Sequence, residues 1–310
     1  MTRFRREEGQ ATVMTALFLI VLVGMAGFVL DVGSWFREQR VAQATVDAAA
    51  LAGAQSLPSN PASANTLATS FAAKNGGVAG ATITFSSRYV TNDTITVTQA
   101  KPAAGLFSRV LGISTVTVHA HAKAISEIPT QVYGAAPIVV KIDHPYLSGP
   151  GCPCFGVPTT IALGKKTSDA GNFVPGAFGM VDFNTGNGNS GASTLADWIT
   201  NGYGHYLPIG NYDSDPGANF DSSQIQSALQ ARYGSDLLFP IFDSLNGNGS
   251  NASYHIIGWA AFHITLVQTS GNNGSISGWF DKVIWQGLLP PTGPTTGIPD
   301  LGIHSVALVD

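Results

Sequence analysis

The first 54 residues of the 310-residue chain predict one long helix whose first half is apolar. No residue from Gly9 to Leu30 is charged. As a helix this run would reach roughly 33 Å at about 1.5 Å per residue, enough to cross a hydrocarbon core of about 30 Å. A cleaved secretory signal would need a shorter apolar run and a small-residue cleavage site. Because the pattern continues without a break, it predicts a membrane-spanning helix.

The same helix is expected to continue well beyond the bilayer. No proline occurs before Pro58, and residues 42–54 are rich in alanine, the best helix former. Trp35 and Phe36 follow the apolar run, where aromatic side chains favour the headgroup region. Arginines flank the run on both sides and give a weak charge bias. We place the N-terminus inside mainly because the sequence after the helix looks extracytoplasmic.

Residues 6–54 resemble the N-terminal Tad domain of bacterial TadE/TadG-like Flp pilus assembly proteins. The residues that carry the resemblance are Gly9-Gln10, the run Gly27-Phe28-Val29-Leu30-Asp31-Val32-Gly33, Gln43, and Asp47-Ala48-Ala49-Ala50-Leu51-Ala52-Gly53-Ala54. A generic membrane anchor has no reason to place that last motif one helical extension after the span. The resemblance implies a single-pass, non-enzymatic envelope protein of the tight-adherence pilus machinery. Its partners would be the lipid bilayer and, through the helix, other proteins of that machinery.

One departure from prepilins concerns processing. Prepilins are cut after a glycine and carry a glutamate at the fifth mature position. If Gly9 were that glycine, Gln10 would be the first residue and Met14 the fifth, so the acid is missing. An unpaired ammonium group in lipid is costly. We expect an unprocessed, membrane-resident assembly component, and a mature N-terminus at Gln10 in mass spectrometry would contradict this.

Four small residues of the helix are candidates for close packing against a partner helix: Gly24, Gly27, Ala48 and Ala52. Small side chains let helix backbones approach closely within membranes. Alanine also forms helices well without any partner, and that alternative stays open.

Between residues 58 and 127 the pattern predicts a short helix followed by strands. Residues 65–73 are helix-like and end near Asn75-Gly76-Gly77, a strong breaker. Residues 81–86, 94–98 and 115–123 alternate β-branched or apolar residues with polar ones, which is typical of half-buried strands. A long helix followed by a small antiparallel sheet is pilin-like in outline.

Beyond Glu127 the chain contains twelve aspartates, no glutamate and five Lys or Arg residues. Aspartate favours turns and glutamate favours helix interiors, so strands and ordered loops are expected here. Strands are predicted at 136–142, 254–268, 275–286 and 305–309, with a hairpin turn at 270–274. Helices are predicted at 194–200, capped by Ser193, and at 223–233, capped by Asp221 or Ser222.

The expected fold class is α+β, with a long N-terminal transmembrane helix, a small pilin-like α+β segment and a β-rich extracytoplasmic domain. Residues 1–57 would hold the cytoplasmic stub, the membrane helix and its alanine-rich extension. Residues 58–127 would form the small segment, 128–289 the β-rich domain and 290–310 a Pro/Gly-rich tail. The protein would lie in the plasma membrane with its N-terminus inside and its C-terminal domain outside.

Cys152 and Cys154 are the only cysteines and stand in the sequence Gly-Cys-Pro-Cys-Phe. Outside the cytoplasm a disulfide is the default fate of a thiol pair, although a single intervening residue imposes tight geometric limits. A zinc site would need further ligands at the usual spacing, and none follows. A local disulfide is the main interpretation and free thiols are the alternative.

Two patterns suggest metal binding, and each has a plain structural explanation. His119 and His121 alternate on a predicted strand and so face one side, which two exposed histidines explain equally well. Oxygen ligands alternate, as in calcium loops, at Asp213, Asp215, Asn219 and Asp221. The bidentate glutamate of an EF-hand is missing, and a turn with a helix cap accounts for the same residues. We expect no metal and no cofactor, with calcium as the alternative.

Charge and motifs narrow the functional classes. The net charge of −4 and the acidic second half disfavour nucleic acid as a partner. The sequence contains no Gly-x-Ser-x-Gly elbow, His-Glu-x-x-His helix or phosphate-binding loop. Asp143, His144 and His205 could form a hydrolytic site only if folding brought them together. The main hypothesis is a structural pilus component without a small-molecule substrate, and a membrane-tethered hydrolase or binding protein is the alternative.

Overall fold

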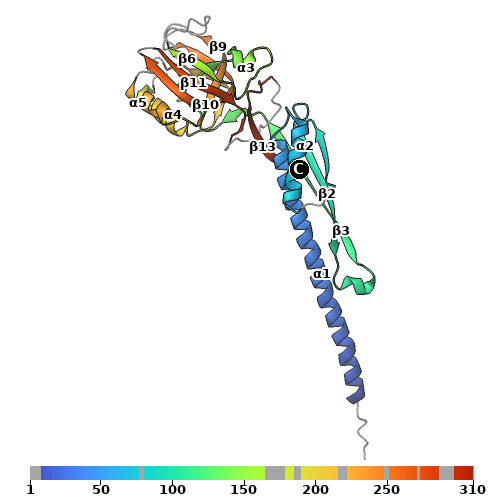
Figure 1. Cartoon of the computed structure of the whole chain (residues 1–310). Helices are drawn as coiled ribbons and strands as arrows, with labels where there is room; N and C mark the ends of the chain where they lie inside the picture. The colour runs from blue at the N-terminus through green and yellow to red at the C-terminus, as the bar shows by residue number, and fades with distance from the viewer. Residues whose placement is uncertain are drawn as a thin grey trace, which may run out of the picture. The chain divides into compact units, whose positions relative to one another are not determined.

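The computed structural model describes residues 8–76, 80–164, 179–184, 190–215, 222–247, 251–270, 273–285 and 297–309, to which all structural statements refer. The chain divides into two compact units. Unit 1 is Met1–Ser126 with Val306–Asp310, and unit 2 is Glu127–Ser305. The fold class is α+β, as predicted: a long apolar N-terminal helix is followed by shorter helices and many strands (Figure 1).

Unit 1 begins with α1 (Glu8–Ala54), one continuous helix of 47 residues. In its first half the large apolar side chains from Val13 to Leu30 are between 48% and 68% exposed. This helix is long and apolar enough to cross a membrane. The second half is different, because Val46, Ala49, Ala50 and Ala54 have no exposed surface. The predicted extension beyond the apolar run is confirmed, and it serves as a core element.

The alanine-rich end of α1 packs on α2 (Pro61–Lys74). Asn60 caps α2, because its side chain accepts a hydrogen bond from the backbone N–H of Ser63 at 2.9 Å. Every fourth residue along one face of α2 is a buried alanine: Ala64, Ala68 and Ala72. Small side chains on both helices allow the backbones to lie close together, so the alanine content of this region has a packing role inside unit 1.

A sheet completes the core of unit 1. It contains β1 (Thr82–Ser86), β2 (Thr94–Ala104) and β3 (Thr115–Glu127), paired antiparallel in that order. β2 is longer than the predicted 94–98. Residues 94–98 of β2 pair with both β1 and β3, whereas residues 99–104 pair with β3 alone. Pro102 lies in this second part, where β2 has no neighbour on the β1 side, so the missing N–H of proline costs no hydrogen bond to β1. β13 (Ile303–Val309) follows β3 in the strand order and brings the chain's last residues into unit 1.

A buried carboxylate fastens the turn between β1 and β2. Asp93 accepts hydrogen bonds from the backbone N–H groups of Arg88, Tyr89 and Val90 at 2.6–2.8 Å, and from the Thr94 hydroxyl at 2.7 Å. Burial alone would raise the pKa of Asp93, but these donors hold it below its ordinary value. The carboxylate stays ionised and pins the turn.

Unit 2 is built around a six-stranded sheet in the order β5-β9-β10-β11-β6, with β8 also paired to β10. The strands are β5 (Val140–Lys141), β6 (Thr159–Gly164), β8 (Gly210–Asp213), β9 (Asp236–Asn246), β10 (Ser253–Ser270) and β11 (Asn273–Asp281). The predicted hairpin at 270–274 forms, since Ser270 pairs with Asn273. Phe239, Phe262 and Phe280 stack or meet edge-to-face in the core, and all three are fully buried.

Shorter elements surround this sheet. They are β4 (Gln131–Val132), α3 (Pro145–Ser148), α4 (Gly191–Asn201), β7 (Leu207–Pro208), α5 (Ser223–Gln230) and β12 (Val283–Ile284). Ser222 caps α5, as predicted, by accepting the N–H of Ile225 at 3.3 Å. The cap of α4 is Ser190 and not Ser193. The helix starts earlier because buried acids hold Ser190: its hydroxyl donates to Asp182 at 2.7 Å and its N–H to Asp215 at 2.9 Å.

Candidate functional site on the N-terminal helix

Asp31 lies on α1 directly after the apolar run and is 1% exposed. Its carboxylate accepts hydrogen bonds from the backbone N–H groups of Leu106, Phe107 and Ser108 at 2.8, 3.0 and 2.6 Å. These three residues belong to the connection between β2 and β3. A charged group at this point of an apolar helix is costly without partners, and here the hairpin tip supplies them.

The tip, residues 105–113, is shaped to present those N–H groups. Ser108–Leu111 form the short 3-10 helix η1, and the Ser108 hydroxyl donates to the carbonyl of Ile113 at 2.9 Å. Gly112 ends the turn with a φ of 83°, a conformation that favours glycine. Gly105 N–H donates to the carbonyl of Ser114 at 3.0 Å and closes the base of the tip. These hydrogen bonds lie within the tip and hold its shape without any contribution from α1.

Three residues of α1 at four-residue spacing hold the hairpin. A Cβ atom on Gly27 would lie 2.7 Å from the Phe107 ring, so the absent side chain makes room for that ring. Asp31 binds the backbone of the tip, and Trp35 donates its Nε1–H to the carbonyl of Ala104 at 3.2 Å. Residues four apart share one face of a helix. This face of α1, with Gly27, Asp31 and Trp35, is called the hairpin seat.

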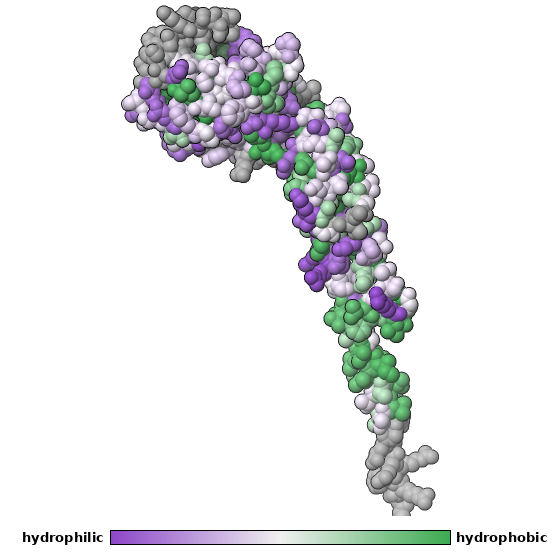
Figure 2. Space-filling model, in the orientation of Figure 1, coloured by the Kyte–Doolittle hydropathy of each residue, from purple (hydrophilic) through white to green (hydrophobic). Residues whose placement is uncertain are grey.

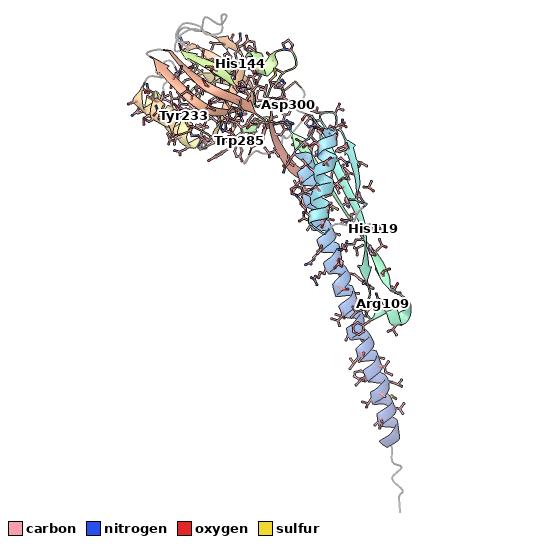
Figure 3. The ribbon with its side chains drawn as sticks, in the orientation of Figure 1. Arg109, His119, His144, Tyr233, Trp285 and Asp300 are labelled. Carbon is pink, nitrogen blue, oxygen red and sulfur yellow. A yellow bond between two sulfur atoms is a disulfide. The ribbon has the colours of Figure 1, made fainter. Side chains whose placement is uncertain are left out.

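The contact between α1 and the β2–β3 hairpin continues on the C-terminal side of the hairpin seat. Glu38 forms an ion pair with Lys101 of β2 at 2.8 Å, and the Gln43 side chain donates to the carbonyl of His121 of β3 at 2.8 Å. A groove of about 340 Å³ lies between α1 and β3, with Phe36 and His119 in its lining. Figure 3 shows Arg109 at the hairpin tip beside α1 and His119 farther along the strand. The hairpin therefore follows α1 back to the end of its apolar run.

The four candidate packing residues lie in different surroundings. Nothing comes within 4 Å of a Cβ atom placed on Gly24, whereas Gly27 is covered by Phe107. Ala48 is half-buried, and Ala52 is buried in unit 1 with 4% of its surface exposed. Gly24 is therefore the candidate whose surface the rest of unit 1 leaves open.

The cysteines and histidines of unit 2 have structural partners. Cys152 and Cys154 form a disulfide. His144 caps α3, accepting the Tyr146 N–H at 3.2 Å, and its ring meets Phe280 edge-to-face. Burial lowers the pKa of His144, and the nearby Asp143 opposes that effect. His205 is exposed and contacts the Tyr203 ring.

His144 and His205 make separate contacts. Within the described ranges, no hydrogen bond, ion pair or ring contact joins His144 to His205. Unit 2 has a groove of about 600 Å³ lined by aromatic, aliphatic and amide side chains, among them Phe183, Tyr203 and Tyr212. Such a lining suits binding more than acid–base chemistry.

Half of the calcium candidate can be located. Asp213 is exposed on β8, while Asp215 is fully buried and accepts the Ser190 N–H. Asn219 and Asp221 lie outside the described residues. His119 and His121 are both exposed on β3, as their alternation predicts. In the described part of the chain no group of three His, Cys, Asp or Glu side chains is placed to hold a metal ion.

The sequence singles out Gly27 for helix packing and Trp35 for the headgroup region, but it does not predict that these residues and Asp31 hold the β2–β3 hairpin. Two signals point to them. Asp31 is a lone acid at the end of an apolar run, which needs a partner. The connection between the two strands carries five large apolar residues where a turn normally has polar ones: Leu106, Phe107, Val110, Leu111 and Ile113. Neither signal shows by itself that the two features meet.

Comparison with known families identifies the segment that contains the seat. The family model described as Tad, a putative Flp pilus-assembly TadE/G-like family, matches residues 9–56. No curated protein and no solved structure matches the chain. The match covers α1 nearly from end to end, so residues 9–56 are a Tad domain, as the sequence resemblance implies. One long apolar helix also fits a single-pass membrane protein.

Proposed function

We propose, from the Tad domain at residues 9–56, that this protein is a structural, membrane-anchored component of a Tad/Flp pilus assembly system. In this proposal α1 crosses the plasma membrane once, with the N-terminus in the cytoplasm and with unit 2 and the part of unit 1 that follows the apolar run outside. The helix meets other proteins of the pilus machinery within the bilayer. The family match is the observation that carries the proposal.

The hairpin seat supports a permanent anchor. A signal sequence would be removed after translocation, but Gly27 and Asp31 both hold the β2–β3 hairpin of unit 1. Cleavage after the apolar run would separate these residues from the tip that depends on them. The apolar segment and the folded unit therefore belong to one structure.

The disulfide supports the proposed orientation. Bonds such as Cys152–Cys154 form and persist in oxidising compartments and are rare in the cytosol. The bond therefore supports a location of unit 2 outside the membrane. Arginines at positions 3, 5 and 6 precede the span and agree with a cytoplasmic N-terminus.

Lateral packing of α1 would use the surface that unit 1 leaves open. A Cβ atom added to Gly24 would have no neighbour within 4 Å, and Val21 and Phe28 beside it on the helix are more than half exposed. A glycine flanked by apolar side chains allows a second helix to approach closely. The partner is another membrane helix of the pilus machinery.

Gene deletion tests the function. We expect cells without the gene to lose surface filaments in electron microscopy, and the full-length protein to restore them. A triple variant with Asp143→Asn, His144→Gln and His205→Ala should restore them as well, because a structural component does not need these groups. Normal filaments after deletion, or failure of a stably expressed triple variant, would contradict the proposal.

A second complementation experiment tests whether unit 1 functions without unit 2. Residues 128–304 would be replaced by a short Gly/Ser linker, which keeps the last residues of β13. A short linker suffices because the Ser305 hydroxyl lies 3.5 Å from the carbonyl oxygen of Glu127. We expect this protein to restore filaments at least in part, since the family match lies entirely within unit 1.

A further inference from the structure

The tip of the β2–β3 hairpin exposes an unusual amount of apolar surface. Val110 is 87% exposed, Leu111 79% and Leu106 74%, and Ile113 and Phe107 are more than 40% exposed. Soluble domains seldom leave so many adjacent large apolar side chains in water. Figure 2 shows apolar surface gathered on the lower part of α1 and on the neighbouring end of the hairpin.

The position of this tip along α1 is fixed by the hairpin seat. Phe107 packs on Gly27, and the backbone from Leu106 to Ser108 is bound by Asp31. The apolar run of the helix ends at Leu30, between these two contacts. Because one helical turn rises about 5.4 Å, the tip lies at the level of the last turn of the run.

We propose that the hairpin tip, residues 105–113, inserts into the interface of the same bilayer that α1 crosses and forms a second membrane contact. This inference rests on the spanning helix proposed above, but it is independent of the pilus role. If the apolar run lies within the hydrocarbon core, Val110 and Leu111 stand at the membrane surface. Their burial there is favourable, as for other apolar loops and helices that enter the interface.

The chemistry around the tip fits lipid better than a protein partner. Arg109, between Ser108 and Val110, is exposed and can reach headgroup phosphates while its stem lies along apolar surface. Trp35 and Phe36 stand one turn above Asp31 on α1, at the depth that aromatic side chains prefer. Beyond the tip, β3 begins with the exposed residues Thr115 and Thr117. The apolar surface of the hairpin therefore ends at the level where the proposal places the aqueous phase.

Depth-dependent quenching in vesicles tests the proposal. The full-length protein, with Cys152→Ser and Cys154→Ser, would carry Val110→Cys labelled with the fluorophore NBD. It would be reconstituted at a low protein-to-lipid ratio into phosphatidylglycerol–phosphatidylcholine vesicles that contain nitroxide lipids. The matched control is the same label at Asn65→Cys, an exposed position on α2. We expect quenching at position 110 to exceed that at position 65 by at least about fivefold.

The label itself could draw the tip into lipid, so a second variant controls for that. Adding Leu106→Glu and Leu111→Glu to the labelled protein should reduce quenching at position 110 to near the control value, because charged side chains resist insertion. Equal quenching at positions 110 and 65 would overturn the inference. A blue-shifted signal that ignores nitroxide lipids and grows with protein concentration would also overturn it, and would indicate a second copy of the chain as occupant.

Resistance to alkaline carbonate extraction is measured on the same vesicles. Extraction of the protein would show that α1 does not span, which is a failure of the proposed anchor. Retention without quenching at the tip is a failure of this inference alone.

Discussion

Replacing Gly53 with leucine is expected to separate α2 from α1 and to disrupt the core of unit 1. A Cβ atom at this position would lie 2.5 Å from Cδ1 of Ile95 and 3.0 Å from the backbone oxygen of Ala64. The Ile95 side chain can rotate away, but the Ala64 oxygen belongs to the α2 backbone. We expect a loss of stability above about 3 kcal/mol, the upper end of ordinary overpacking.

Hydrogen exchange of the α2 amides in the detergent-solubilised protein measures this loss. The matched control is Gly33→Leu, the same substitution in the same helix, where nothing lies within 4 Å of the new Cβ. That variant should keep wild-type protection of the α2 amides. Its stability could rise by up to about 1 kcal/mol, because leucine favours the helical conformation more than glycine does. Protection of α2 that survives Gly53→Leu would show that the core of unit 1 accommodates the larger side chain without loss of stability.

Replacing Asp31 with asparagine is expected to release the hairpin tip from α1. The carboxylate receives the N–H groups of Leu106, Phe107 and Ser108. An amide of the same shape carries no charge and turns two of its own donors toward this cluster. The tip should therefore detach, although the hydrogen bonds within it, such as that from Ser108 to Ile113, can persist.

Trypsin cleavage after Arg109, which is exposed on the tip, reports the release. In mild detergent the Asp31→Asn variant should be cut at least roughly tenfold faster than the wild type, because cleavage follows the population of the open form. The control is Asp47→Asn in the same helix, where the carboxylate accepts a local hydrogen bond from Gln43. Equal cleavage rates in both variants would mean that Asp31 does not hold the hairpin.

The sequence predicts the parts of this fold that depend on local patterns. The long helix, the hairpin near residue 270 and the Ser222 cap each follow from periodicity or from residues three or four apart. The meeting of Asp31 with the tip joins residues 75 to 77 positions apart. Local patterns hold no information about such a contact, because the pairing of β2 with β3 decides which part of the tip faces α1.

Two strands of unit 2 show how tertiary packing overrides local preference. β9 is not among the strands predicted from the sequence. Pro240 interrupts its apolar run, and proline is unfavourable in central strands. It forms nevertheless, with Pro240 opposite Trp259 of β10 and its apolar residues buried. The predicted strand at 136–142 is instead reduced to Val140–Lys141, with single bridges at Ala135 and Ile138.

The Tad motif at residues 47–54 gains a physical explanation from the structure. Ala49, Ala50 and Ala54 are fully buried, and a Cβ atom on Gly53 would lie 3.0 Å from the backbone oxygen of Ala64 in α2. The motif therefore packs inside unit 1, whereas no atom of the described residues lies within 4 Å of a Cβ placed on Gly24 in the apolar half.

The return of β13 to unit 1 has a consequence for biogenesis. β13 lies next to β3 in the strand order, and β3 ends at Glu127, so unit 2 is synthesised before this edge of β3 can be covered. During synthesis β3 therefore keeps an open strand edge until residues 306–309 have been made. Premature termination anywhere in unit 2 would leave that edge uncovered, and such truncated chains should tend to aggregate by pairing with other strands.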